Sequence, residues 1–476
     1  MDNDRIVGPL LYLRGVSDDR LLLTAVLVLP AHADGPALLT GTGSVSGTSI
    51  REIEGRRVLH YAFSLPAAAD AWYELEGVRY QVNAAWSGDL RIAFVSCNGQ
   101  EEGDRERSPD ERNALWRRLM RQHDERPLNL ILHGGDQIYA DELVNCHPLV
   151  RRWADGADVG NALSAEDRNE VAQALRRAFL RRYFQVLAQP EIAWLMARVP
   201  SLAMWDDHDI CDGWGSMRET KLDAPIGQML FSAARELFLM FQLGSAPDHL
   251  PDICLDQSGA SLSWQMRLPQ LTMIAPDLRS ERRPDRVMGE RGWSALETAL
   301  GRVEAGRVLV LSTVPALGPR LSWLEGAMHF TPHAEKYEDD LRDQWQSRAH
   351  RAEWRRFLEL LLKCHDDPDT PLTVVSGEIH LATRGTLDGA AEPLHQLVAS
   401  GIAHPAPPIL YARALGALAR FGESPVPSRS VRLYPLPGKS AIYTAQRNYL
   451  VLARLQDRWQ AWWELERDGP TAPLQL

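Results

Sequence analysis

The chain lacks the features of a disulfide-stabilised or membrane-spanning protein. Its five cysteines are an odd number, lie far apart and form no CxxC pair, which is typical of a reducing compartment. No apolar run reaches the roughly 18–20 residues that a membrane span needs. The strongest candidate, residues 21–31, follows a segment with more acidic than basic residues, whereas a signal peptide begins with basic residues. We therefore expect a buried strand there and a cytoplasmic protein with no membrane span.

Positive charge is also scarce. The 476 residues include 52 basic and 63 acidic side chains, which gives a net charge of −11. This balance argues against nucleic acid as a partner. It does not exclude an anionic substrate, because bound cations can reverse the potential inside one cleft. With 45% apolar and 24% charged residues, the composition is that of an ordinary globular protein.

The first 88 residues have the pattern of β-structure, and the rest has the pattern of an α/β fold. Before residue 88, apolar and β-branched runs at 22–29, 58–65 and 72–82 are separated by turns rich in Gly and Asp. From residue 89, strand, helix and strand patterns alternate, which predicts a layered α/β domain over 89–476. Helices are expected over 109–126, 165–199, 227–243 and in the polar region 335–363. Strands are expected over 90–97, 128–132, 201–205, 262–268, 271–275, 308–314 and 372–375. A long Pro- and Gly-rich loop or lid is expected over 403–440, and a closing hairpin over 449–455 and 459–465.

Four of the expected strands end in residues that can bind metal ions. These residues are Cys97, Asp136 with Tyr139, the acidic run from Asp206 to Asp212, and Glu378 with His380. One such strand end means little, because a histidine after an apolar run is commonly a hydrogen-bonded structural residue. Four of them in one α/β chain can converge on one or two cations at the edge of a sheet.

Such a set of ligands suits the hydrolysis of phosphate esters. The reaction brings a nucleophile up to an anion, and a two-metal site supplies hydroxide and neutralises charge on the attacking and leaving oxygens. One carboxylate usually bridges the two metals. Asp136, which follows the flexible pair Gly134 and Gly135, suits that role.

In their order and spacing, these segments resemble the motif blocks of PhoD-like metallophosphatases, the alkaline phosphatase D branch of the calcineurin-like metallophosphoesterases. The resemblance covers nearly the whole chain and depends on the shared order, since any single block is weak. The blocks are Ser96-Cys97-Asn98, Gly135-Asp136-Gln137-Ile138-Tyr139, Trp205-Asp206-Asp207-His208-Asp209 and Ser376-Gly377-Glu378-Ile379-His380, followed in strength by Asp277-Leu278-Arg279 and Asp343-Gln344-Trp345.

The resemblance implies a four-layer α/β/β/α sandwich over 89–476 and a small N-terminal β-sandwich domain over 1–88. It also implies a ferric iron with calcium, although another divalent metal stays possible. By motif position, the iron would be held by Cys97, Asp136 and Tyr139. The second metal would be held by Asp212, Glu378 and His380, with Asp136 as the bridge.

The resemblance also assigns roles around the metals. His208 and Asp207 become the catalytic candidates, with His208 facing the scissile phosphate, and Arg279 and Asn98 become the substrate-binding candidates. Two alternatives stay open: Arg279 could pair with Asp277 or Glu281, and Cys97 could be an inert buried cysteine.

The chain departs from the commonest family pattern at two positions. Glu378 stands where Asp is usual, and Asp212 stands where Asn is usual. Both side chains keep oxygen donors, so the binding of hard cations survives, but the identity of the metal and the substrate are less determined.

We therefore expect a metal-dependent phosphoric ester hydrolase that acts on small phosphate esters. A metal-bound hydroxide would attack in line, with no covalent enzyme intermediate, and the sequence leaves open the choice between phosphomonoesterase and phosphodiesterase and the oligomeric state. The first alternative is a catalytically silent binding protein with the same fold. The competent ligand that each motif position still carries argues against it. The second is a mononuclear zinc hydrolase.

Overall fold

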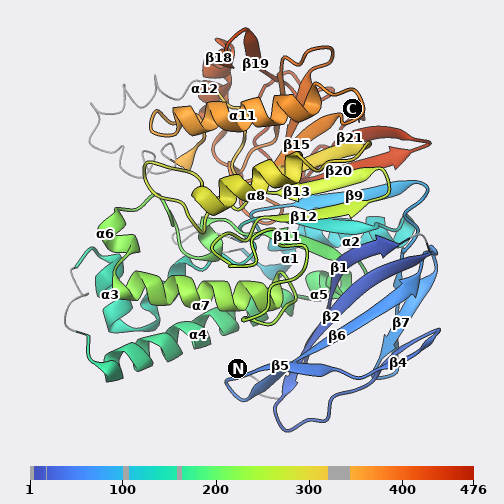
Figure 1. The fold of residues 1–476 in the computed structure, drawn as a ribbon, viewed down its shortest axis with the longest axis vertical. Helices are drawn as coiled ribbons and strands as arrows, with labels where there is room; N and C mark the ends of the chain where they lie inside the picture. Colours follow the sequence, from blue (N-terminus) through green and yellow to red (C-terminus); the bar gives the residue numbers. More distant parts are fainter. Residues whose placement is uncertain (1–4, 18, 100–106, 158–162, 320–342) are drawn as a thin grey trace.

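The structure of the protein is a computed structural model that describes residues 5–17, 19–99, 107–157, 163–319 and 343–476. Within these ranges the chain has a mixed α/β fold built on two large β-sheets and one small sheet (Figure 1). No helix among these residues is both long enough and apolar enough to cross a membrane.

The first large sheet combines strands from the beginning, the middle and the end of the chain. In sheet order its strands are β22 (Gly469–Pro470), β21 (Arg458–Leu465), β20 (Asn448–Leu455), β9 (Leu90–Val95), β10 (Leu130–Gly134), β11 (Ser201–Met204), β1 (Val7–Ser17), β2 (Arg20–Pro30), β6 (Arg56–Pro66) and β5 (Thr48–Ile53), with β23 (Leu474–Gln475) paired to β21. The central strands β9, β10, β11 and β1 run parallel. Strands β10 and β11 are buried along their whole length, as expected for the centre of a parallel sheet.

The N-terminal strands are part of this sheet. Strand β1 pairs in parallel with β11, in the register Tyr12 to Ser201, and antiparallel with β2. The predicted boundary after residue 88 therefore falls within one continuous sheet. A separate small sheet is formed by β4 (Gly43–Val45), β3 (Leu38–Thr40), β7 (Ala71–Leu75) and β8 (Val78–Val82). An independent N-terminal β-sandwich domain stays a prediction.

The second large sheet has a parallel centre and antiparallel edges. In sheet order its strands are β12 (Trp264–Leu268), β13 (Leu271–Ala275), β14 (Arg307–Ser312), β15 (Leu372–Ser376), β17 (Leu394–Val398), β16 (Thr383–Leu387), β19 (Arg429–Tyr434) and β18 (Glu423–Val426). Strands β13, β14, β15 and β17 run parallel, so the loops after them lie at one edge. The buried apolar side chains form two clusters, the larger around the first sheet and the smaller around the second.

Most of the expected helices are confirmed. The helices are α1 (Pro109–Arg112), α2 (Ala114–Glu125), α3 (Pro148–Ala154), α4 (Ala165–Leu187), α5 (Pro190–Met196), α6 (Glu219–Leu222), α7 (Pro225–Phe241), α8 (Glu290–Leu300), α11 (Arg351–His365) and α12 (Ile409–Ala419), with short 3₁₀ turns η1 (Asp141–Cys146) and η2 (Asp207–Asp209). The segment 165–199 forms two helices, because Pro190 cannot continue α4 and begins α5 instead. Residues 335–342 of the expected helical region lie outside the described residues.

The expected long loop over 403–440 is wrong as secondary structure. This segment forms α12, β18 and β19, which lie together at the top of Figure 1. Prolines and glycines stand on both sides of α12, but the helix itself is mainly Ala, Leu and Arg, which are strong helix formers. Its function as a lid stays a prediction.

Candidate metal centre

The loops that follow β9, β10, β11 and β15 meet at one edge of the two large sheets. The loop after β9 is bonded to the loop after β10, since the N–H of Cys97 donates to Gly135 O at 3.2 Å and the N–H of Asn98 donates to Asp136 O at 2.7 Å. The loop after β15 also passes close to β9. A Cβ atom on Gly377 would lie 2.4 Å from Ser96 Oγ, so this approach requires glycine.

The backbone is unusual at the predicted ligands. Left-handed φ angles, which are uncommon outside glycine, occur at Cys97 (52°), Asp136 (57°), Tyr139 (51°), Glu378 (64°) and His380 (54°). Such conformations cost free energy and cluster at functional sites. Five of the six predicted metal ligands therefore carry the backbone signature of a functional site.

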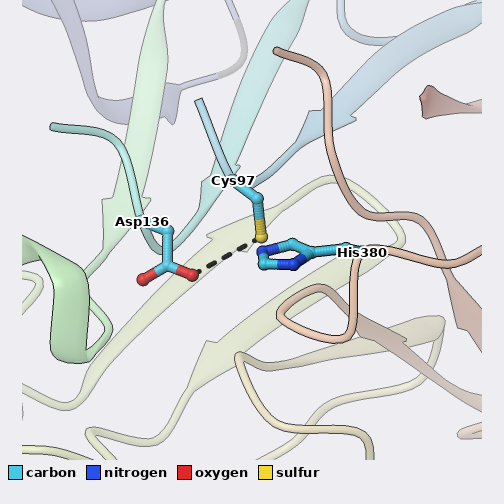
Figure 2. Close-up of side chains that lie close together, drawn as sticks. All are labelled: Cys97, Asp136 and His380. Atoms are coloured by element: carbon cyan, nitrogen blue, oxygen red, sulfur yellow. Dashed lines mark hydrogen bonds between the residues drawn. The ribbon is translucent and has the colours of Figure 1, made fainter. Parts of the chain in front are cut away.

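Two compact groups of possible ligand atoms share Asp136. The first consists of Cys97, Asp136 and His380 (Figure 2), and the second of Asp136, Asp207 and His208. Within each group the ligand atoms lie within 4.8 Å of one another, and Cys97 Sγ is 3.5 Å from Asp136 Oδ2. Among the described residues, the buried Oδ1 of Asp136 has no hydrogen-bond partner. A cation would satisfy it, so the residues fit a metal ion held by Asp136.

Burial controls the charge of these ligands. It raises the pKa of Asp136 well above its usual range, and the neighbouring Asp206 carboxylate adds to this effect. Burial, followed by the Asp136 carboxylate, also raises the pKa of the Cys97 thiol well above its usual range. A bound cation favours both deprotonated forms, because its charge compensates for the lost hydration.

The other three predicted ligands lie next to these groups. Tyr139 Oη is 3.1 Å from His380 Nε2. Asp212 and Glu378 line the same cavity of about 470 Å³ as Asp136 and His380. The compact groups differ from what the resemblance implies, since His380 lies with Cys97 rather than with Asp212 and Glu378. The assignment of each ligand to iron or to a second metal stays a prediction.

His208 is held at the cavity by an aromatic and an acidic neighbour. Its ring stacks on Tyr139, with 4.5 Å between the ring centres, and its Nδ1 lies 2.9 Å from Asp141 Oδ2. Burial by itself lowers the pKa of His208, but the carboxylates of Asp141 and Asp207 hold this pKa well above its usual range. This shift favours the protonated ring, from which a proton can be donated into the cavity that His208 lines.

Neither predicted substrate-binding residue is available to a substrate in the large cavity. The Arg279 side chain has 0% exposed surface and forms ion pairs with Asp206, Asp207 and Asp343. It therefore positions carboxylates behind the site. Its guanidinium does not pair with Asp277 or Glu281, although the backbone N–H of Arg279 donates to Asp277 Oδ1 at 3.0 Å.

Asn98 is also used internally. Its Oδ1 accepts a hydrogen bond from Trp116 Nε1 at 2.7 Å, and its Nδ2 donates to Gln137 O at 3.2 Å. Asn98 lines a second, much smaller cavity of about 30 Å³. Both substrate-binding assignments stay predictions, and in this structure the polar atoms of both side chains are taken up by protein partners that the sequence did not show.

Several residues that support the site were missed from the sequence. The Asp209 carboxylate accepts the backbone N–H groups of Asp136, Gln137 and Ile138, so it fixes the loop that carries the bridging candidate. Asp209 belongs to the motif block Trp205-Asp206-Asp207-His208-Asp209, so its place in that block was the sequence signal that could have identified it.

Ser400 and His404 gave no comparable signal. Ser400 Oγ is 3.1 Å from Cys97 Sγ and accepts the N–H of His380 at 2.8 Å. The His404 ring stacks on His380, with 3.5 Å between the ring centres. Both residues lie about 300 positions from Cys97 along the chain, so only the fold brings them to the site.

Comparisons with known proteins give the family and the fold of the chain. The family model described as "PhoD related phosphatase" matches residues 89–337, just over half of the 476-residue chain. The Saccharomyces cerevisiae protein "Uncharacterized protein YGR266W" is 23% identical over 334 residues, which cover 58% of this chain and 47% of the yeast protein. The chain thus spans about half the length of this curated relative.

Two solved structures share the fold. One, described as "Structure of PhoD", has a TM-score of 0.61 and 13% identity, over 98% of this chain and 88% of that chain. The other, purple acid phosphatase PPD1 from yellow lupin (Lupinus luteus) seeds, has a TM-score of 0.52 and 10% identity, over 98% of this chain and 73% of that chain.

The region matched by the family model contains the loops after β9, β10 and β11, with Cys97, Asp136 and His208. Glu378 and His380 lie beyond it, and the fold brings them to the same cavity. The motif order, the fold and the match over more than half of the sequence agree, and the chain belongs to the PhoD related phosphatase family.

Proposed function

We propose that the protein is a metal-dependent phosphoric ester hydrolase whose metals are bridged by Asp136. The observation that carries this proposal is the position of Asp136. Its carboxylate lies within 4.8 Å of the ligand atoms of Cys97 and His380 and also of those of Asp207 and His208, and its buried Oδ1 has no hydrogen-bond partner among the described residues. Of these neighbours, His208 is assigned as the proton donor and not as a metal ligand. The family match supports the reaction class. The substrate is a small phosphate ester, and the choice between monoester and diester depends on the assay below.

The residues of this chain prepare the reaction around the metals. When bound, a metal pair supplies a hydroxide nucleophile at neutral pH and neutralises charge that develops on the phosphate oxygens. His208 donates a proton to the leaving alcohol oxygen. Because Asp141 binds Nδ1 of His208, Nε2 is the ring atom that can give up this proton. Asp207 is held by the N–H of Gly213, which donates to its Oδ2 at 2.8 Å.

The finer features of the family are part of the same proposal. The two large sheets, with α8 and α11 against the second and α4 and α5 against the first, support a four-layer α/β/β/α arrangement. The thiol of Cys97 and the phenol of Tyr139 support ferric iron at one position, and the carboxylates support calcium at the other. A cytoplasmic location stays a prediction.

The proposal is tested by measuring metal and turnover on the same protein. Elemental analysis should find metal in the purified wild type, which should hydrolyse p-nitrophenyl phosphate or bis-p-nitrophenyl phosphate. Asp136→Asn and Asp136→Ala should lose metal and lose more than about 100-fold in activity, since even residues that only support a metal ligand typically contribute 10- to 100-fold. Asp248→Asn, at an exposed position, is the matched control.

The other outcomes separate the alternatives. A metal-free wild type with no turnover would support a catalytically silent binding protein. A colourless, active zinc protein would support the mononuclear zinc hydrolase, because tyrosinate bound to ferric iron absorbs visible light and zinc does not. Full activity in Asp136→Ala would overturn the proposal.

A further inference from the structure

The large cavity has two chemically different walls. The strand-end loops supply the acidic and imidazole groups of the candidate metal centre. The opposite wall is apolar. It comes from α12 with the residue before it, from the loop after β14 and from the segment before β20: Leu317, Pro408, Tyr411, Leu415 and Tyr443. The cavity volume of about 470 Å³ lies in the range of small-molecule sites, so there is room for more than a phosphate group.

The cavity offers little to a second negatively charged group. Among the described residues that line it, Lys221 is the only lysine or arginine. The Nζ of Lys221 donates to Ala154 O at 3.0 Å and lies 4.9 Å from the centre of the Trp153 ring. Its charge is therefore engaged outside the cavity. Away from the metal-binding wall, a second phosphate would therefore meet only Lys221 among the described lysines and arginines, and the charge of Lys221 is already engaged.

The apolar wall is part of the core of the second sheet. Leu317, Tyr443 and Ala412 of α12 are buried in the same cluster, and Leu415 packs against it. Helix α12 approaches Tyr443 closely, since a Cβ on Gly416 would lie 3.9 Å from Tyr443 Cδ2. This packing joins the wall to the core of the second sheet. Tyr411 keeps 39% of its surface exposed and lines the cavity from the same helix.

From these observations we propose that the site accepts phosphate esters whose alcohol part is apolar, and that Tyr411 and Leu415 contact that part. The inference rests on the proposed hydrolase function. The phosphate lies at the acidic, metal-binding wall, and the alkyl or aryl group covers apolar surface that would otherwise face water. Burial of each methylene is worth about 0.8 kcal/mol, which is about three- to fourfold in affinity or in kcat/KM.

The test compares p-nitrophenyl esters of methyl, butyl and octyl phosphate, each below its aggregation concentration. For the wild type, kcat/KM should rise about three- to fourfold for each added methylene until the cavity is filled. Leu415→Gln and Tyr411→Gln should reduce this rise. Leu410→Gln is the matched control, because Leu410 is on the same helix, is 76% exposed and does not line the cavity.

A binding measurement keeps this inference separate from the proposed function. In calorimetry, octylphosphonate should bind the wild type more tightly than methylphosphonate does, with a negative heat-capacity change, and Leu415→Gln should reduce the difference. If no ester is hydrolysed but this difference is found, the hydrolase proposal fails and the apolar wall is supported. Equal affinities and a flat chain-length series would overturn the inference.

The same apolar group could reach the site in a soluble ester or in a lipid held in a bilayer. Phosphatidylglycerol vesicles distinguish these sources. A lower rate on vesicles for Leu410→Gln, with the soluble octyl ester unaffected, supports a bilayer source, because only a bilayer would contact that exposed side chain. Turnover of the octyl ester without turnover of vesicles supports a soluble source.

Discussion

At the scale of single residues, the proton donor of the proposed reaction depends on Asp141. One oxygen of this carboxylate binds Nδ1 of His208, and the other accepts the N–H of Asp212 at 2.7 Å. Asp141→Asn should keep the second contact and remove the negative charge beside His208. We expect kcat to fall about 10- to 100-fold, as for other residues that orient a functional group.

The pH profile gives this prediction a second readout. Activity that needs protonated His208 is lost as pH rises through the pKa of that residue, and Asp141 is one of the charges that raise this pKa. In Asp141→Asn the alkaline limb of the kcat profile should therefore move to lower pH. Asp155→Asn, which removes a surface ion pair with Arg151, is the control. An unmoved alkaline limb would show that Asp141 does not act through His208.

Single residues also show how far the sequence could predict the site. Cys97, Asp136 and His380 were predictable because each follows a strand in a recognisable motif, and the structure brings them together. The partners of a side chain were not predictable. Arg279 is occupied by carboxylates from distant segments, and Ser400 reaches Cys97 only through the pairing of β15 with β17. Motif order identifies possible ligands, while long-range packing decides which of them face the cavity.

At the scale of elements, strand β1 provides the sharpest test of the domain organisation. It lies between β11 and β2, and Tyr12 on this strand donates a hydrogen bond from its hydroxyl to Phe241 O at 2.7 Å. A chain that begins at residue 89 would expose the edge of β11 and the core side chains that face β1. We expect this shortened chain to show no cooperative thermal transition by circular dichroism.

A second shortened chain is the control for this experiment. Strand β23 pairs only with β21 at the outside of the sheet, so a chain that ends at residue 473 should still unfold cooperatively. If the chain from residue 89 unfolds with the same Tm as the full chain, residues 1–88 are an independent domain, as the sequence suggested.

Elements with a clear periodicity were predicted well, including α7, which begins at Pro225, whereas one helix in a segment rich in Pro and Gly was missed. The closing hairpin appears as β20 and β21, and the expected helix over 227–243 appears as α7. Helix α12 was missed because the prolines before it and the glycine after it outweighed its four alanines and three leucines, which have high helix propensity. Its packing through Ala412 and Ala419 on the second sheet then stabilises it.

At the scale of the whole molecule, two buried histidines make stability depend on pH. Burial, with a contribution from Arg198, lowers the pKa of His123 to about 4. Burial also lowers the pKa of His133 to about 4, although a hydrogen bond with Gln137 opposes the shift. In the unfolded chain both histidines bind protons near pH 6.5. Between these values the unfolded state binds more protons, so the free energy of unfolding falls as the pH drops from 6.5 towards 4.

This dependence is measurable with one substitution. Each histidine contributes up to about 1.4 kcal/mol per pH unit in this window. In the wild type, the N–H of Leu128 donates to His123 Nδ1 at 3.1 Å. In His123→Asn the amide oxygen can still accept this hydrogen bond, but the amide cannot take up a proton. Chemical unfolding from pH 7.5 to 4.5 should therefore show a shallower slope in His123→Asn than in the wild type, by up to about 1.4 kcal/mol per pH unit. His32→Asn, at an exposed position, is the control. Equal slopes in His123→Asn and the wild type would show that burial does not keep His123 neutral.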